Sequence, residues 1–202
     1  MEDGHPSTRT KRLSKKLSWL LRHGATEAGL PMDAAGWVAV ADVLRIIEID
    51  DATLDELIRT NRKQRLQRTG DRVRACQGHS DGVPVTREAL EASWTRYTAE
   101  RAWHGTHVDA IEGIAERGIS ARARTHVHLA AELDSVVGKR ANVHVMLGVS
   151  IPALRERGLD AFEAPNGVVL VREVPTECIV ELRAQTKRAR AREAELRGMF
   201  GL

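Results

Sequence analysis

Residues 65–75, Arg-Leu-Gln-Arg-Thr-Gly-Asp-Arg-Val-Arg-Ala, predict a β-hairpin in the N-terminal half of the chain. Two short segments, Arg65–Arg68 and Arg72–Ala75, flank Thr69-Gly70-Asp71, and a short connection that contains glycine is typical of a hairpin. Arginine recurs on both sides of the turn, and its guanidinium group binds phosphate through two parallel hydrogen bonds. The hairpin is therefore predicted to be a basic element that can contact a phosphate-bearing partner.

The sequence before the hairpin predicts helices and one strand. Leucines recur at helical spacing over 13–21, and Gly24 is expected to end this first helix. A short strand at 37–40 leads into a short helix at 41–47, and Asp50 or Asp51 can cap a third helix. The residues expected to face the core are Leu13, Leu17, Leu20, Leu21, Val43, Leu44, Ile47, Leu54, Leu57 and Ile58. Helix, strand, helix, basic helix and basic hairpin follow one another as in a winged-helix domain, which binds nucleic acid.

The second half of the chain has a different pattern. A polar stretch at 81–100 marks a boundary, and beyond it β-branched segments alternate with short helical ones. The expected strands are 126–130, 142–149, 162–163, 168–171 and 179–182; the expected helices begin at Val108, Glu132 and Pro152, and Asn166-Gly167 is expected to form a tight turn. The predicted fold class is α+β, with lobes at 1–90 and 100–185 and a basic tail at 186–202.

Composition excludes several classes of protein. Of 202 residues, 42% are hydrophobic and 29% charged, so the chain can bury a core. It has no run of about 18 apolar residues and a polar N-terminus, which argues against a membrane protein and a secretory signal. Two cysteines, Cys76 and Cys178, are too few for a disulfide framework or a four-cysteine zinc site. These features favour a cytoplasmic protein.

The charge of the chain is concentrated in clusters. Lys and Arg number 31 against 28 Asp and Glu, a net charge of only +3, yet the basic residues gather at 9–22, 59–74 and 183–197. Such clusters in a nearly neutral protein favour a nucleic-acid partner, although a solvated surface explains the last cluster equally well. Aromatic residues make up 3% of the chain, which argues against a platform of several aromatic residues for stacking bases.

Two kinds of catalytic centre are weakly supported. His126 and His128 would share one strand face, and His104 could join them, but no cysteine or carboxylate lies at a zinc-ligand spacing. We therefore expect no metal. Ser80 follows His79 directly, but the chain lacks the G-x-S-x-G motif of a nucleophilic serine.

The stronger candidates are basic residues. Arg22 and His23 directly precede Gly24, where they either stabilise the helix terminus or form part of a site. Arg65 lies in a basic run, and Arg124 stands two residues before His126. Spacing alone does not separate the structural from the catalytic interpretation of these residues.

Short blocks of sequence, in the same order along the chain, resemble the RNA 2′-phosphotransferase family over about residues 11–182. The blocks are Leu-Ser-Trp-Leu-Leu-Arg-His-Gly-Ala at 17–25, Lys-Gln-Arg at 63–65, Arg-Ala-Cys-Gln-Gly-His-Ser at 74–80, His-Gly-Thr at 104–106, Arg-Thr-His-Val-His-Leu-Ala at 124–130 and Asn-Gly-Val at 166–168. Cys76 departs from this pattern, because the family usually has a polar residue there, and we expect the difference to be neutral.

The resemblance implies a specific reaction. The family transfers an internal 2′-phosphate of RNA to NAD⁺, without a metal, and yields RNA with a free 2′-OH, nicotinamide and ADP-ribose 1″,2″-cyclic phosphate. It also implies a winged-helix lobe followed by an ADP-ribosyltransferase-like lobe, and a role in RNA processing such as tRNA splicing. We expect a monomer whose partners are 2′-phosphorylated RNA and NAD⁺, with no membrane partner.

The resemblance further implies the catalytic residues Arg22, His23, Arg65 and Arg124. Arginines can stabilise the charge that builds on the phosphate oxygens, and a histidine can transfer a proton near neutral pH. Arg122 and Arg140 are close alternatives to Arg124.

For the cofactor, the resemblance implies His104, Gly105, Thr106 and His128. In ADP-ribosyltransferases the histidine of a His-Gly pair binds a ribose hydroxyl, and the glycine backbone binds the nicotinamide amide because no Cβ blocks the ring. His128 would stack on nicotinamide, and residues 166–169 provide no carboxylate. Two rival functions are an ADP-ribosyltransferase that caps nucleic-acid phosphates and a winged-helix regulator with an NAD-sensing lobe.

Overall fold

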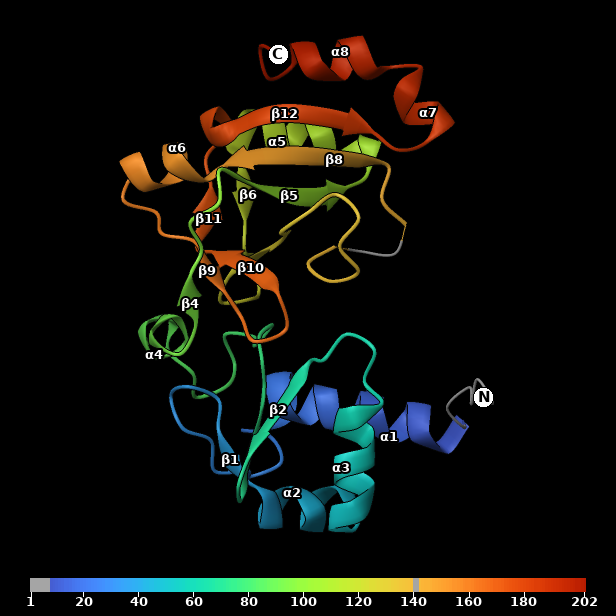
Figure 1. Ribbon diagram of the computed structural model, residues 1–202, viewed down its shortest axis with the longest axis vertical. Helices are drawn as coiled ribbons and strands as arrows, with labels where there is room; N and C mark the ends of the chain where they lie inside the picture. Colours follow the sequence, from blue (N-terminus) through green and yellow to red (C-terminus); the bar gives the residue numbers. More distant parts are fainter. Residues whose placement is uncertain (1–7, 140–141) are drawn as a thin grey trace. The chain divides into compact units, whose positions relative to one another are not determined.

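A computed structural model of the protein describes residues 8–139 and 142–202. Contacts within the chain separate two units, residues 1–93 and 94–202, and the division falls in the interval between the two predicted lobes (Figure 1). Each unit mixes helices with antiparallel sheet, which confirms the α+β class. Among the described residues, no helix has the length and apolar character needed to cross a bilayer. His5 and Arg140 lie outside the described residues.

Unit 1 contains helices and one small sheet, in the order that the sequence predicts. The sheet has the order β1-β3-β2 and is antiparallel throughout. The elements are α1 (Thr8–Trp19), the π-helical turn η1 (Leu20–Gly24), β1 (Val38–Ala39), α2 (Val40–Ile47), α3 (Asp51–Arg59), β2 (Leu66–Thr69), β3 (Arg72–Ala75) and α4 (Arg87–Ala92). The predicted hairpin is β2–β3, and the helix α4, within the polar stretch 81–100, was not predicted.

Local sequence explains these elements. The carboxylate of Asp50 accepts the backbone N–H of Thr53 at 2.8 Å, so Asp50 and not Asp51 caps α3. Gly70 has φ +58°, the left-handed conformation that a tight hairpin turn requires. The predicted leucines Leu17, Leu54 and Leu57 are buried together in the core of unit 1.

The first helix continues through η1 and ends at Gly24, as predicted. Gly24 is not a left-handed C′ glycine, however, because a turn over 25–29 follows and closes in a Schellman motif around Gly29, which has φ +60°. There the N–H of Leu30 donates to the carbonyl of Ala25 at 2.8 Å, and the N–H of Gly29 donates to the carbonyl of Thr26 at 3.2 Å.

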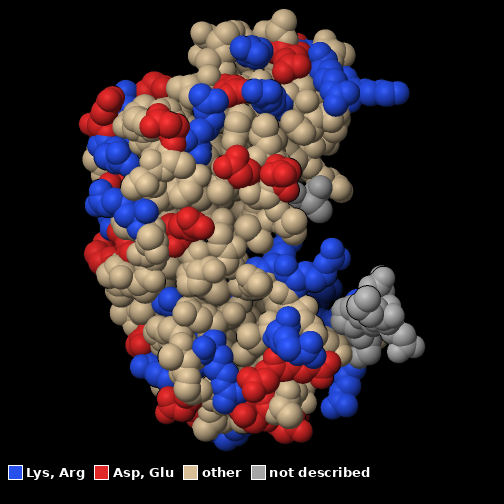
Figure 2. All heavy atoms as spheres, in the orientation of Figure 1, with Lys and Arg blue, Asp and Glu red and all other residues tan. Residues whose placement is uncertain are grey.

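The basic cluster around the hairpin is partly neutralised within unit 1. Arg68 lies 2.9 Å from Asp51 and 2.8 Å from Asp55, and these carboxylates raise the pKa of its guanidinium group. Arg72 pairs with Asp33 at 2.9 Å, and Arg74 is buried. Figure 2 accordingly shows blue and red side chains intermixed on the visible face of this unit. The hairpin arginines are therefore less available to a phosphate than the sequence suggests.

Unit 2 is built on a seven-stranded antiparallel sheet with the order β12-β8-β5-β7-β10-β9-β4. Strands β11 and β6 form a separate two-stranded antiparallel sheet. The strands are β4 (Thr95–Arg96), β5 (Arg101–Thr106), β6 (Ile119–Ser120), β7 (Val127–Ala130), β8 (Val145–Ser150), β9 (Phe162–Glu163), β10 (Val168–Val171), β11 (Glu173–Val174) and β12 (Ile179–Ala184). The helices are η2 (Val108–Ala110), α5 (Ile111–Arg117), α6 (Ile151–Glu156), η3 (Thr176–Cys178), α7 (Lys187–Arg190) and α8 (Glu193–Gly198).

The described apolar residues of unit 2 include a large cluster and a small cluster. The large cluster joins β-strand residues such as Leu147 and Val169 to residues of the helices, including Ile111 in α5 and Leu154 in α6. The small cluster contains Trp103, Ala130 and Met146, with Leu133 and Val143 packed against it. Alternation along β5 places Ala102 in the large cluster and Trp103 in the small one, so the clusters lie on opposite faces of the sheet.

Two segments of unit 2 differ from their predictions. No helix forms at 132–137; instead, the Ser135 hydroxyl accepts the backbone N–H of Glu132 at 3.0 Å, which favours a local turn. The predicted basic tail, by contrast, folds onto unit 2 as α7 and α8. Ala189 and Leu196 from these helices are buried in the large cluster, so this segment has a packing role that its charge concealed.

Candidate active site

Arg22 and His23 occupy consecutive positions of the π-helical turn η1. Turns of this kind are frequent at functional sites. Leu20 and Leu21 are buried and anchor the turn in the core, whereas Arg22 is half-buried and His23 is exposed. The turn therefore presents the His23 imidazole at the surface, whereas Nε and Nη2 of the Arg22 guanidinium are buried.

The chain segment after β3 bonds to the backbone of both predicted arginines of unit 1. The N–H of Cys76 donates to the carbonyl oxygen of Arg65 at 2.8 Å, and the N–H of Ser80 donates to the carbonyl oxygen of Arg22 at 3.0 Å. The Ser80 hydroxyl also donates to this Arg22 oxygen at 3.4 Å. Residues 76–80 thus bond to the backbone of both Arg65 and Arg22, and His23 follows Arg22 in η1.

A short turn before β2 fixes the position of Arg65. Asn61, which is buried, accepts the N–H of Gln64 with its carbonyl oxygen at 2.7 Å and the N–H of Arg65 with its side-chain oxygen at 3.3 Å. Gln64 has φ +44°, a left-handed conformation that is strained for a residue other than glycine. Strain of this kind persists only where surrounding contacts impose it, and here it directly precedes a predicted catalytic residue.

Cys76 has a structural role that the sequence did not indicate. Its thiol donates to the carbonyl oxygen of Gln64 at 3.3 Å. Burial raises the pKa of this thiol to about 11, although the positive charges of Arg74 and Arg22 lower it in part. The thiol is therefore protonated at neutral pH and acts as a hydrogen-bond donor.

Asn61 and Ser80 are the contributors to this arrangement that sequence reasoning missed. Asn61 follows the end of a helix and precedes a basic turn, a position where asparagine commonly bonds to the backbone. Ser80 belonged to a family-like block, but it was considered only as a nucleophile. His79 is completely buried, and a Cβ on Gly36 would lie 2.7 Å from its Nε2, so it packs inside unit 1.

Arg124 lies in unit 2, in the loop between β6 and β7. Its side chain is exposed, and its N–H donates to the carbonyl of Ala121 at 3.2 Å. The neighbouring Arg122 is also exposed and has φ +54°. His126 anchors the loop, because its buried ring meets the Trp94 ring edge-on at 5.0 Å between centroids. The loop presents both Arg122 and Arg124 to solvent, so both remain candidates for the predicted catalytic arginine of unit 2.

The predicted cofactor residues lie where the ladder between β5 and β7 ends. The two strands pair only at Trp103 and Ala130, two residues before Gly105. In antiparallel strands alternate residues bond to the same neighbour, so the N–H and C=O of Gly105 point toward β7, as those of Trp103 do. The carbonyl of His128, which would face Gly105 in a longer ladder, instead lies 3.4 Å from Nδ1 of His104. The Gly105 amide therefore faces the open end of the ladder.

A protein segment lies over Gly105. A Cβ added there would lie 2.7 Å from Cγ2 of Val143 and 3.2 Å from Cβ of Lys139. Thr106 is buried and His128 is half-buried. The absence of a Cβ at Gly105 thus leaves room for a group to approach the sheet, and in this structure Val143 fills that room.

The histidines near these residues do not form a metal site in the described parts of the chain. Within residues 8–139 and 142–202, no three His, Cys, Asp or Glu side chains gather closely enough to hold a metal ion. The rings of His107 and His144 are in edge-on contact, with centroids 4.4 Å apart, but no third ligand joins them. Independence from metal stays a prediction.

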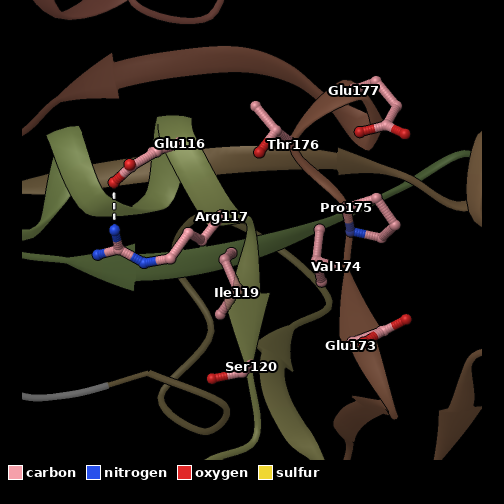
Figure 3. A pocket seen from close by; sticks show the side chains of 9 residues that line it. All are labelled: Glu116, Arg117, Ile119, Ser120, Glu173, Val174, Pro175, Thr176 and Glu177. Carbon is pink, nitrogen blue, oxygen red and sulfur yellow. Dashed lines mark hydrogen bonds and ion pairs between the residues drawn. The ribbon is translucent and has the colours of Figure 1, made fainter.

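A separate pocket lies beside the β11–β6 sheet (Figure 3). Its rim carries the carboxylates of Glu116, Glu173 and Glu177, and Arg117 forms an ion pair with Glu116. None of the predicted catalytic or cofactor residues lines it. An acidic rim also disfavours a phosphate, so this pocket does not belong to the candidate site.

Comparison with known proteins identifies the family. A model of the RNA 2′-phosphotransferase, Tpt1 / KptA family, matches residues 8–173. A probable RNA 2′-phosphotransferase of Burkholderia lata is 36% identical over 186 residues, which cover 88% of this chain and 93% of the relative. The tRNA 2′-phosphotransferase 1 of Homo sapiens is 34% identical over 175 residues, 80% of this chain and 69% of the relative. A probable RNA 2′-phosphotransferase of Pyrococcus furiosus is 31% identical over 179 residues, 85% of this chain and 94% of the relative. The chain in which residues 76–80 bond to the backbone of Arg22 and Arg65 belongs to the RNA 2′-phosphotransferase family of transferases.

Proposed function

We propose that this protein removes an internal 2′-phosphate from RNA by transferring it to NAD⁺. In the first step, an oxygen of the RNA 2′-phosphate forms a bond to C1″ of the nicotinamide-bearing ribose, and the bond to nicotinamide breaks with its electron pair. In the second step, the ribose O2″ attacks phosphorus and loses its proton, while the bond from phosphorus to the RNA O2′ breaks and O2′ takes up a proton. The products are 2′-OH RNA, nicotinamide and ADP-ribose 1″,2″-cyclic phosphate.

The observation that carries this proposal is that residues 76–80 bond to the backbone of both Arg65 and Arg22, with His23 next to Arg22 in η1. A 2′-phosphate is a dianion, and guanidinium groups bind its oxygens through charge-assisted hydrogen bonds. Arg22 is half-buried among residues of the core, where such bonds are stronger than in water. Protein groups fixed in advance need not reorganise when charge builds on the phosphate oxygens during the second step.

His23 is proposed to transfer the proton of the second step. It is exposed at the surface of η1 and neighbours Arg22 in the turn, so it can approach a phosphate that Arg22 binds. Imidazole can accept a proton from an attacking hydroxyl and return one to a departing oxygen near neutral pH. Arg124, in the unit 2 loop, is proposed as a further catalytic residue, with Arg122 as the alternative.

The backbone of Gly105 is available to bond to a nicotinamide group, but neighbouring side chains restrict the space for its ring. The Gly105 amide faces the open end of the β5–β7 ladder, so its N–H and C=O can bond to a carboxamide. Val143 and Lys139 lie over the same glycine, so a ring can approach Gly105 only if these side chains move. His104 and Thr106 are polar neighbours on the same strand, and His128 is the proposed stacking partner.

We also propose a fold type for each unit. The order of helices and the β2–β3 hairpin support a winged-helix assignment for unit 1, and the position of His104-Gly105 at the end of a ladder supports an ADP-ribosyltransferase-like unit 2. A cytoplasmic, monomeric enzyme of RNA processing is proposed with them.

Incubation of the protein with a 2′-phosphorylated oligoribonucleotide tests the proposal. We expect loss of the phosphate only when NAD⁺ is present, and undiminished activity in EDTA. Phosphate release without NAD⁺, or activity that a chelator abolishes and a divalent metal restores, would overturn it. If ADP-ribose remains attached to the RNA as the end product, the protein is instead an ADP-ribosyltransferase that caps nucleic-acid phosphates.

A further inference from the structure

Trp19 differs from the other aromatic residues of the protein. The chain has four Trp, one Tyr and two Phe. Within the described part of the chain, Trp19 is the one aromatic side chain that is exposed, with 46% of its surface accessible. Trp94, Tyr97 and Trp103 are buried, and Trp37 is half-buried under the guanidinium of Arg74, at 4.5 Å. Tryptophan is enriched at interfaces, so this exposed indole is a candidate contact for a binding partner.

The indole ring is held against the turn that carries Arg22 and His23. A Cβ on Gly24 would lie only 2.3 Å from Cζ3 and 2.4 Å from Cη2 of Trp19. The ring therefore rests on the bare Cα of Gly24, while the residue as a whole stays exposed to solvent. This contact gives the ring a fixed position next to the proposed catalytic residues.

The surface around Trp19 is cationic. Helix α1, Thr-Arg-Thr-Lys-Arg-Leu-Ser-Lys-Lys-Leu-Ser-Trp, contains no acidic residue. Lys15 and Arg12 precede Trp19 by four and seven positions, so they share its helix face, and both are exposed. A flat apolar ring on a basic strip matches a single-stranded nucleic acid, whose phosphates pair with the cations while a base stacks on the ring. An apolar protein partner would have no use for this charge.

We propose that Trp19 stacks on an unpaired base of the RNA substrate, adjacent to the nucleotide whose 2′-phosphate lies at Arg22. This inference rests on the proposed function for the identity of the substrate. It assigns to α1 a part in RNA binding, which unit 1 was predicted to perform through α3 and the β2–β3 hairpin. Stacking accepts every base, so Trp19 contributes affinity and position without sequence preference.

Tryptophan fluorescence tests the proposal without relying on turnover. A single-stranded oligoribonucleotide, with and without a 2′-phosphate, is titrated into the full-length protein, and binding is followed in parallel by anisotropy of a labelled RNA. We expect quenching in the wild type and loss of most of that quenching in Trp19→Phe, which binds RNA within about 3-fold of the wild type. Trp19→Ala is expected to bind about 5- to 100-fold more weakly, the range for loss of one stacked base.

Two further variants make the result decisive. Trp19→Leu keeps apolar bulk without a π-face and is expected to resemble Trp19→Ala, whereas Gly24→Ala displaces the ring and is expected to reduce quenching. Arg45→Gln is the matched control, because Arg45 is exposed on α2 and paired with Asp42 at 2.8 Å. Equal RNA affinity of the wild type and Trp19→Ala, or no quenching by RNA, would overturn the proposal. Quenching without phosphate transfer would refute the proposed reaction but leave Trp19 as an RNA contact.

Discussion

Cys76 donates its backbone N–H to the carbonyl oxygen of Arg65 at 2.8 Å and its thiol to the carbonyl of the preceding Gln64 at 3.3 Å. The buried Cys76 therefore bonds to two successive backbone carbonyl groups, the one before the proposed catalytic Arg65 and the one of Arg65 itself. Asn61 bonds to the same two residues from the opposite end of the turn. Arg65 thus owes its position to contacts on both sides, and the left-handed Gln64 between them has little freedom to relax.

Asn61→Ala should lower kcat while leaving the fold intact. The change removes the acceptor for the Arg65 N–H, a bond worth about 1 kcal/mol, so we expect roughly a 5-fold decrease in kcat with KM for NAD⁺ unchanged. Asn61→Asp keeps an oxygen acceptor and should restore most of the rate. Steady-state kinetics and thermal unfolding of both variants check this. An equal loss in Asn61→Asp would mean that the Asn61 oxygen does not position Arg65.

The Cys76 thiol should make stability depend on pH in alkaline solution. Its pKa is raised by burial from 9.0 to about 11, so the folded state holds the proton more tightly than the unfolded state. This contribution is fully present below pH 9 and is lost as the pH rises toward 11, a difference of about 2–3 kcal/mol.

Urea unfolding at pH 8 and pH 10.5 measures this effect. The wild type should lose more free energy of unfolding between the two pH values than Cys76→Ala, in which other titrating groups, including Cys178, are unchanged. Parallel losses in the two proteins would show that the Cys76 thiol does not titrate in this range.

Two arginines of the basic cluster should behave differently. Arg62 is exposed, whereas Arg68 is held by Asp51 and Asp55. Arg62→Gln should weaken RNA binding and reduce the slope of log K against log salt by about one, without changing stability. Arg68→Gln should leave RNA affinity unchanged and cost less than about 1 kcal/mol of stability, because its partners are exposed. Salt titrations of RNA binding separate the two, and a reversed pattern would contradict the ion-pair assignment.

Gly105→Ala should impair both packing and NAD⁺ binding. The new methyl group would lie 2.7 Å from Val143, and overpacking of this kind costs about 1–3 kcal/mol. Gly198→Ala is the matched control, because nothing lies within 4 Å of a Cβ there. Thermal unfolding and calorimetric titration with NAD⁺ compare the variants. Normal NAD⁺ affinity in Gly105→Ala would exclude Gly105 from the cofactor site.

The sequence predicted elements whose signals are local. Asp50 capped α3, Gly70 marked the hairpin and Asn166-Gly167 marked a turn, because each depends on the backbone chemistry of a few residues. The helix predicted at 132–137 does not form, because a contact that composition does not reveal favours a turn there. Its helical composition was outweighed by a side-chain bond from Ser135 to the Glu132 backbone, and composition does not encode that choice.

The family-like blocks proposed Arg22, His23 and Arg65 as site residues, and their catalytic roles stay predictions. Nothing in the spacing of these residues showed that residues 76–80 would bond to the backbone of both arginines. That relationship depends on contacts between segments more than 50 residues apart in the case of Ser80 and Arg22. The neutralisation of Arg68 by two aspartates of α3 was likewise hidden, because ion pairs between elements require the fold.

The most direct measurement of the central claim follows a radioactive label placed in the 2′-phosphate of an oligoribonucleotide. With NAD⁺ and the wild-type protein, the label should leave the RNA and appear in ADP-ribose 1″,2″-cyclic phosphate. In Arg65→Ala and Arg124→Ala it should accumulate in ADP-ribosylated RNA, because the second step slows by about 10- to 100-fold when one charge-assisted contact is lost. Label recovered as inorganic phosphate, or released equally without NAD⁺, would contradict the account.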